Sequence, residues 1–166
     1  MNNGVEVLVE ICREAVSLPE YARPNDAGMD VCAAEEIFLK PGETVIIPTG
    51  LKLAIPEGYE IQVRPRSGVS FKTPLRLSNS PGTIDSGYRD ELGIIMTNTS
   101  EQCKSTEDKI IDIDSKGNMK GIYRIKKGDR IAQLVLQIVP RIKFTLVDSV
   151  ISIGENRGGG FGSTGI

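Results

Sequence analysis

The residues with the clearest potential for chemistry lie between Asn79 and Glu91, where a carboxylate and an aromatic ring occur close together. Asp85 follows the strand-type pair Thr83-Ile84 and precedes a Ser-Gly turn, and Tyr88 comes next. The pattern predicts a β-hairpin with the acid and the ring at its tip. Rigid strands often present reactive groups on such loops. An ordinary hairpin with solvated polar residues at its tip explains the same segment.

A second polar cluster, Arg66-Ser67-Gly68, comes directly after a predicted strand that ends at Pro65. A guanidinium, a hydroxyl and neighbouring backbone N–H groups together form a small anion cradle that suits phosphate oxygens. The alternative is a solvated turn in which Ser67 caps a short helix near residues 69–72.

Two further segments place polar side chains at the start of strands. Gln133 and Arg130 follow the turn Lys127-Gly128-Asp129. Gln133 could donate to a phosphate oxygen, directly or through water, although strand alternation also explains it. Asp30 ends the loop from Tyr21 and could face the water shell of a metal, or it could simply belong to a loop that enters a strand.

The last eleven residues, 156–166, are rich in glycine and cannot form a strand or a helix of their own. The pattern predicts a segment that is disordered until a ligand orders it. It carries Arg157, two hydroxyls, free N–H groups and the isolated Phe161, which is typical of a phosphate-cradling loop. A flexible tail is the alternative.

The composition excludes several classes of chemistry. The chain has no histidine, which rules out Ser-His-Asp and Cys-His catalysis and His-ligated zinc. Its three cysteines are widely spaced, which argues against a disulfide framework and a Cys-x-x-Cys metal site. Proton chemistry must therefore rest on carboxylates, Tyr, Lys or water, and any metal should be a hard ion such as Mg²⁺.

The elements that position these residues are short β-branched runs between glycines and prolines. Such runs predict strands at 5–11, 44–48, 51–55, 59–63, 93–97, 130–139 and 142–150. This spacing is typical of an all-β barrel or sandwich. We expect one domain over residues 1–155, followed by the arm 156–166. Within that domain, residues 101–123 are predicted to project as a second hairpin.

Charge and hydropathy indicate a soluble, cytoplasmic chain. The 166 residues carry a formal net charge of −2, and their Lys and Arg do not cluster as a nucleic-acid groove requires. No apolar run is long enough to span a bilayer, and no secretory signal is recognisable at the N-terminus. We therefore expect neither a nucleic acid nor a membrane as a partner.

Taken together and in this order, five segments resemble the motifs of the homotrimeric dUTP diphosphatase (dUTPase) family. They are residues 22–30, 64–68, 79–91, 128–133 and 157–165. The resemblance covers nearly the whole chain. It implies a jelly-roll-like β-barrel with a Gly-rich C-terminal arm, trimers with active sites shared between subunits, and hydrolysis of dUTP to dUMP and pyrophosphate.

The resemblance also implies a role for each matching residue. Asp85 matches the general base that orients water toward the α-phosphorus, and Tyr88 matches the ring that packs on deoxyribose. Asn79 and the backbone around Thr83, Ile84 and Gly93 match the pocket that binds the edge of uracil. Phosphate contacts match Arg66, Ser67, Gly68, Gln133, Arg157, Gly162, Ser163 and Thr164. Phe161 matches the ring stacked on uracil. Mg²⁺ would sit on the triphosphate, with Asp30 at most a partner through water.

Two departures and two rival functions remain. The segment 101–123 is longer than the usual connection between the third and fourth motifs of the family. Asp90 replaces a glycine that is common after the Tyr-Arg pair. A dCTP deaminase, alone or bifunctional, shares this fold, but such enzymes resemble one another in a Ser-Ser pair after the second-motif Arg and in a catalytic Glu. Here Gly68 follows Ser67, and the acid is Asp85. A non-catalytic jelly-roll protein is the other rival.

Overall fold

The computed structural model describes residues 4–101, 109–115 and 117–159, and these form one short helix and strands throughout. The helix is α1 (Ser67–Lys72). The strands are β1 (Leu8–Ile11), β2 (Met29–Cys32), β3 (Ile37–Leu39), β4 (Thr44–Pro48), β5 (Leu51–Ala54), β6 (Tyr59–Pro65), β7 (Leu75–Leu77), β8 (Gly82–Ile84), β9 (Gly93–Asn98), β10 (Ile110–Asp112), β11 (Ile122–Ile125) and β12 (Arg130–Ile138). The predicted all-β class is confirmed.

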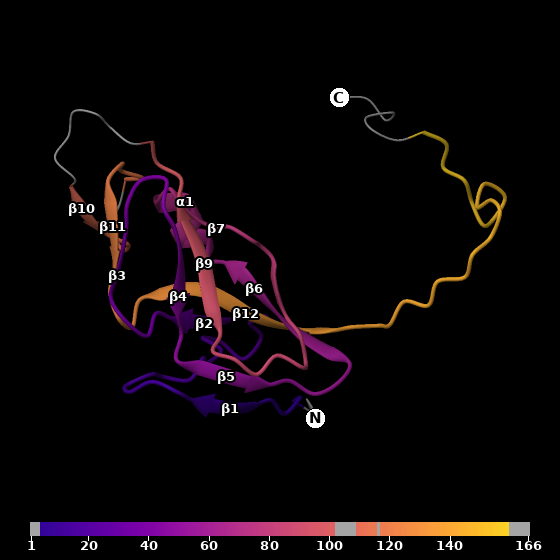
Figure 1. Cartoon of the computed structure of the whole chain (residues 1–166), viewed down its shortest axis with the longest axis horizontal. Coiled ribbons are helices and arrows are strands. Elements are labelled where there is room, and N and C mark those ends of the chain that lie inside the picture. Colours follow the sequence, from indigo (N-terminus) through magenta and orange to yellow (C-terminus); the bar gives the residue numbers. More distant parts are fainter. Residues whose placement is uncertain (1–3, 102–108, 116, 160–166) are drawn as a thin grey trace.

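The strands assemble into four sheets, which Figure 1 shows packed around a common interior. A four-stranded sheet has the order β2-β12-β6-β8, and all its pairs are antiparallel. Three-stranded sheets have the orders β4-β9-β7 and β10-β11-β3, and β1 pairs with β5. The long strand β12 therefore lies between β2 and β6 and pairs with both.

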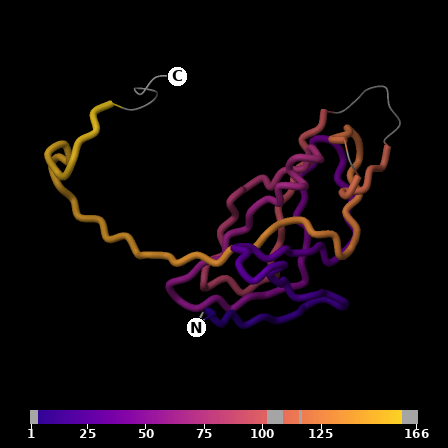
Figure 2. Tube along the Cα trace, turned by 180° about the vertical axis from the view of Figure 1, so that it is seen from behind, coloured from indigo at the N-terminus to yellow at the C-terminus, as the bar shows by residue number. Residues whose placement is uncertain are grey.

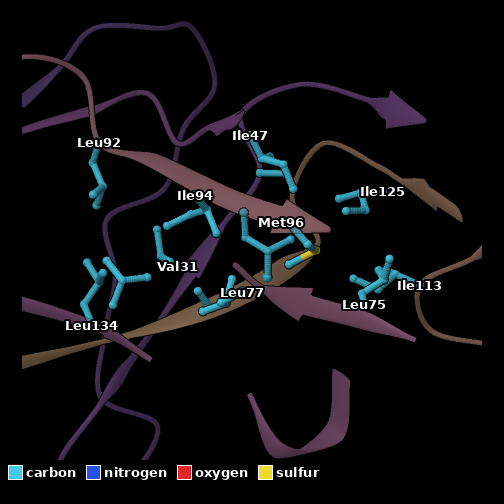
Figure 3. Close-up of a cluster of buried hydrophobic side chains, with 14 of the residues drawn as sticks. Val31, Ile47, Leu75, Leu77, Leu92, Ile94, Met96, Ile113, Ile125 and Leu134 are labelled. Carbon is cyan, nitrogen blue, oxygen red and sulfur yellow. The ribbon is translucent and has the colours of Figure 1, made fainter. Parts of the chain in front are cut away.

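Strand alternation places the core between these sheets. Along β9, Ile94 and Met96 are each only 1% exposed, while the residues between them face outward in part. Figure 3 shows them in one cluster with other buried apolar side chains, including Ile47 of the neighbouring strand β4 and Leu134 of β12 in the four-stranded sheet. Each such side chain contributes about 1.5–3 kcal/mol to folding, so this interior holds the sheets in fixed positions.

The segment around Asp85 is not the predicted hairpin. β8 pairs with β6, whereas β9 pairs with β4 and β7, so the two strands belong to different sheets. Residues 85–92 cross from one sheet to the other. The turn itself is present, because the Tyr88 N–H donates to the Asp85 carbonyl at 3.1 Å.

The prediction of a projecting hairpin at residues 101–123 is also wrong for the part that the structure describes. β10 and β11 pair in parallel, and β11 pairs antiparallel with β3. Ile111 and Tyr123 are buried at 3% and 1% exposure, so they belong to the core rather than to an exposed protrusion. Residues 102–108 and 116 lie outside the described residues.

The predicted strand at 142–150 does not form within this chain. Ile142, Phe144 and Leu146 alternate as a strand would, but they are 78%, 89% and 98% exposed. Strand backbone needs a partner for its N–H and C=O groups, and no described strand pairs with this segment. Figures 1 and 2 show this segment leaving the sheets after β12 and running into open space.

The start of α1 differs from the alternative in which Ser67 caps the helix. Arg66 is the N-cap residue, with an extended backbone and no hydrogen bond from its side chain to the helix, and Ser67 is the first helical residue.

No helix in residues 4–101, 109–115 and 117–159 has the length and apolar character to cross a membrane.

Candidate active site

Asp85 stands at the point where β8 ends and the chain turns toward the neighbouring sheet. The residue is exposed, and its carbonyl accepts the hydrogen bond that closes the turn to Tyr88. β8 is held in register on β6, with Ile84 opposite Ile61. The carboxylate is therefore presented to solvent by a strand whose position the core fixes.

Tyr88 is held from the other side of the same turn. Its hydroxyl donates to the Glu91 carbonyl at 2.9 Å, and 38% of the residue is exposed. Arg89 braces the turn through bonds to the carbonyls of Ser86 at 2.6 Å and Tyr88 at 2.8 Å. The ring is thus partly open to solvent but tethered at its polar end.

Asp90, where the resemblance implies a glycine, needs no special backbone. The non-glycine residues with positive φ in the described chain are Ala15 and Asn118. Asp90 therefore has an ordinary negative φ, and the replacement adds no strain to the turn.

Arg66 is locked in place by Asp30. The Arg66 guanidinium forms a fork on this carboxylate, with Nε to Oδ1 at 2.8 Å and Nη2 to Oδ2 at 3.1 Å. Its third nitrogen, Nη1, donates to the Arg130 carbonyl at 3.1 Å. Two-point pairing of this kind fixes the plane of the guanidinium as well as its position.

Gln133 joins the same cluster through β12. The register places Gln133 opposite Asp30 on β2, and its Nε2 donates to Asp30 Oδ1 at 3.3 Å. Arg130 Nη1 approaches Asp30 Oδ2 at 3.4 Å. The structure thus brings Arg66 and Gln133 together, with Ser67 and Gly68 exposed at the start of α1.

The residues expected to read uracil surround β8 and the start of β9. Asn79 lies over Gly82, because a β-carbon on that glycine would come within 3.3 Å of the Asn79 Nδ2. Thr83 is exposed and Ile84 is half-buried. Gly93 faces Ile46 so closely that a β-carbon there would meet its Cγ2 at 2.5 Å, which explains glycine at this position.

Asp85 and Arg66 do not meet within one chain. β6 and β8 run antiparallel, so the Asp85 end of β8 lies beside Ile61, whereas Arg66 follows the opposite end of β6. The five steps along the backbone from Ile61 to Arg66 span about 17 Å at about 3.4 Å per residue. A single chain therefore separates its carboxylate turn from its phosphate-type cluster.

Arg157 belongs to neither cluster. It is exposed on the arm that Figure 2 shows extending away from the sheets. The predicted contacts Phe161, Gly162, Ser163 and Thr164 lie outside the described residues. The candidate site is accordingly distributed over three parts of the chain.

The model of one protein family, dUTPase, matches residues 14–111. The chain belongs to the dUTPase family. The deoxyuridine 5'-triphosphate nucleotidohydrolase of Fusobacterium nucleatum is 43% identical over 163 residues, which cover 96% of this chain and 98% of that one.

Solved dUTPase structures have the same fold. The dUTPase of Staphylococcus bacteriophage 80alpha with dUpNHpp has a TM-score of 0.87 and 37% identity, covering 97% of this chain and 99% of the other. A mutant dUTPase from phage phi11 of S. aureus has a TM-score of 0.79 and 32% identity, covering 88% and 99% of the respective chains. That structure describes the coordination of a structural Mg(II) ion.

The residues of this dUTPase fit a magnesium ion only indirectly. Among the described residues, no three His, Cys, Asp or Glu side chains come together as metal ligands. Asp30 accepts two short bonds from Arg66, and its other two contacts, from Gln133 and Arg130, are 3.3 and 3.4 Å long. A carboxylate has about four lone-pair sites, so a metal-bound water could replace one of these longer contacts.

Sequence reasoning did not find two contacts that organise the site. One is the fork between Asp30 and Arg66, which are brought together because β2 and β6 both flank β12. The other is the set of bonds that Glu91 makes just beyond Tyr88. Both join residues far apart in sequence, so no local spacing signals them. The sequence showed only that positions 30 and 91 carry acidic residues, Asp30 and Glu91.

Proposed function

We propose that the protein hydrolyses dUTP to dUMP and pyrophosphate, with Asp85 orienting the water that attacks the α-phosphorus. Membership of the dUTPase family supports the reaction. The observation that carries the mechanism is the placement of Asp85, an exposed carboxylate on a turn that begins directly after β8. The reaction keeps uracil out of DNA and supplies dUMP for dTTP synthesis.

Asp85 acts mainly by position. A carboxylate is a weak base, so it holds the water in line and accepts its proton late, which contributes about 10²–10⁴-fold. The chain has no histidine to take this role. The water must come from the solvent-facing side of the turn, where Asp85 is exposed.

Tyr88 reads the sugar, and its neighbours read the base. A ring tethered through its hydroxyl to Glu91 packs on the deoxyribose and leaves no room for a 2′-hydroxyl. Asn79 and the backbone of Thr83, Ile84 and Gly93 bind the uracil edge. Three of these four residues lie on β8 or β9, which the core holds rigid.

The phosphates are bound by the Arg66 cluster. Arg66 is oriented in advance by Asp30, so little conformational entropy is lost when phosphate binds. Ser67 and Gly68 add a hydroxyl and backbone N–H groups at the first turn of α1, where N–H groups have no helical partner, and Gln133 adds an amide. Mg²⁺ bound to the triphosphate would neutralise charge that develops on its oxygens, and Asp30 would hold a water of that ion.

The active site is shared between chains of a homotrimer. About 17 Å of β6 separates the Asp85 turn from Arg66 in one chain, which is too far for both to act on one α-phosphate. A neighbouring copy that brings its Asp85 turn to this chain's Arg66 cluster would complete the site. This separation supports the shared arrangement.

The arm supplies the third part of the site. Residues 141–153 expose a row of apolar side chains, which an isolated chain gains nothing by presenting to water. If a second copy packs against this row, the end of the same arm would place Arg157 and Phe161 at the active site of a neighbouring copy. There Arg157 would bind the γ-phosphate, Phe161 would stack on uracil, and Gly162, Ser163 and Thr164 would close over the phosphates.

The experiment is a panel of dUTP, UTP, dTTP and dCTP with Mg²⁺, in which released pyrophosphate is measured. We expect release from dUTP and little from the other three. Ammonia release from dCTP would instead support a deaminase, the rival of the same fold. Pyrophosphate from all four nucleotides alike would contradict the assignment of Tyr88 and the uracil pocket. A cytoplasmic location, where deoxynucleotides are made, is part of the same proposal.

A further inference from the structure

Glu91 joins two segments of the chain just beyond the catalytic turn. Its carboxylate accepts a fork from Arg13, with Nε to Oε1 at 2.6 Å and Nη2 to Oε2 at 3.0 Å. The Gly50 N–H donates to the same Oε1 at 2.8 Å. Arg13 also pairs with Glu35 at 2.9 Å. The Arg13 side chain therefore links the N-terminal segment to the residue that anchors Tyr88.

The N-terminal segment that carries Arg13 is itself held firmly. The Cys12 N–H donates to the Gly50 carbonyl at 2.9 Å, and the Lys127 Nζ donates to the Glu14 carbonyl at 2.7 Å. Gly50 has a φ of +72°, and a β-carbon there would meet Val16 Cγ2 at 2.5 Å. Glycine is required at this crossing, and the segment cannot shift freely against it.

The bonds of Glu91 reach Tyr88 through the backbone. The Tyr88 hydroxyl donates to the Glu91 carbonyl at 2.9 Å. The next residue, Leu92, is bound to Leu51 at 2.8 Å, and its carbonyl accepts the Thr49 hydroxyl at 2.7 Å. Since 38% of Tyr88 is exposed, burial alone does not fix the ring. The direction of its tether depends on where Glu91 is held.

We infer that Arg13 is a positioning residue for substrate selection: by fixing Glu91 it aims the Tyr88 ring and so contributes to discrimination against ribonucleotides. This inference rests on the proposed function, which assigns Tyr88 to the deoxyribose. The hydrogen bond from Arg13 also holds the pKa of Glu91 below its ordinary value, so the pair stays charged at neutral pH.

The expected effect is on geometry more than on folding. Arg13 and Glu91 side chains are 38% and 25% exposed, and ion pairs in such settings contribute little to the stability of a fold because water screens them. A shift of about 1 Å in a group that positions substrate can cost about 10²-fold in rate. Loss of the pair should therefore leave the protein folded and less selective.

The test compares Arg13→Ala with Arg124→Ala, a matched control. Arg124 forms the same kind of fork on Asp112, at 2.6 and 3.1 Å, with side chains 35% and 26% exposed. That pair joins β11 to β10, in a different sheet from β8 and β9. The two variants thus remove forks of similar length and exposure at different places.

The measured quantity is the ratio of kcat/KM for dUTP to that for UTP, together with Tm. Arg13→Ala should lower the ratio by about tenfold or more, and Arg124→Ala should leave it unchanged. Arg13→Lys should restore part of the ratio, because an ammonium replaces the charge but not the fork. If Arg13→Ala does not fold, Glu91→Gln tests the same link with the residue's shape retained, and it should lower the ratio as well.

Three results would overturn the inference. An unchanged ratio in folded Arg13→Ala or Glu91→Gln shows that Arg13 does not aim Tyr88. An equal loss in Arg124→Ala shows a general effect of destabilisation. Wild-type protein that hydrolyses UTP as well as dUTP refutes the role of Tyr88 itself, and thus the proposed function rather than Arg13 alone.

Discussion

Chains that carry different inactivating substitutions should restore activity to one another when they assemble together. Asp85→Asn removes the carboxylate of the catalytic turn, and Arg66→Ala removes the phosphate-binding guanidinium. About 17 Å of β6 separates the two positions in one chain. If each site takes Asp85 from one chain and Arg66 from its neighbour, a mixed assembly contains some intact sites.

The size of the recovery follows from random assembly. In an equal mixture, half of the chains carry an intact Asp85 and the other half carry an intact Arg66. For any one site, the chain that supplies Asp85 is therefore intact at that position half of the time, and the chain that supplies Arg66 is intact at that position half of the time. About one quarter of the sites are then wild type, so activity should return to about one quarter of the wild-type rate. The chains are mixed in denaturant and refolded together, and pyrophosphate release from dUTP is measured.

A matched mixture uses two substitutions from the same cluster. Arg66 and Gln133 both contact Asp30 within one chain. Arg66→Ala mixed with Gln133→Ala should therefore give no more than the mean of the two parents. Failure of the Asp85→Asn and Arg66→Ala mixture to exceed its parents would refute the shared site, because it would mean that one chain supplies both groups.

Three other expectations follow from the fold. Truncation after Glu155 should abolish most turnover while Tm, measured by circular dichroism, stays within a few degrees; unchanged rates would make the arm inert. Ile111→Ala should cost about 2–5 kcal/mol in urea unfolding, since this residue is 3% exposed; an unchanged midpoint would mean that β10 lies outside the core. The folded-state pKa of Glu91 is lowered, so Glu91→Gln should cost about 1 kcal/mol or less above pH 4.5. That cost should shrink as the pH falls further, and a cost that grew toward acid would contradict the ion pair.

Local pattern predicted the strands that carry their own signals. Residues 44–48 are β-branched and apolar and end at a proline, and they form β4 with those bounds. The run at 130–139 appears as β12, one residue shorter. Period-two burial and turn residues act over a few positions, so a single sequence is enough to recognise them.

Pairing partners were not predictable in the same way. Thr83 and Ile84 read as one arm of a hairpin with residues 92–96, but Ile84 pairs with Ile61. The choice depends on which sheet can bury each strand's apolar face, and this is decided by distant residues. The same reason explains the parallel pairing of Ile110 with Ile122 in place of a hairpin.

The site was predicted in its residues more than in its arrangement. Residue type and motif order singled out Asp85, Tyr88 and Arg66. The fork from Arg66 to Asp30 depends on β12 lying between β6 and β2, which no spacing reveals. The strand predicted at 142–150 shows the converse limit, because its apolar pattern is present but its partner is not in the described part of this chain.

The most direct test of the proposed mechanism is the turnover of Asp85→Asn with dUTP, measured beside the binding of a non-hydrolysable dUTP analogue. The amide keeps the size of the side chain but cannot accept the proton of the attacking water. We expect analogue binding within a few-fold of wild type and turnover lower by at least about 10²-fold. Turnover equal to that of the wild type would show that Asp85 does not act on the water.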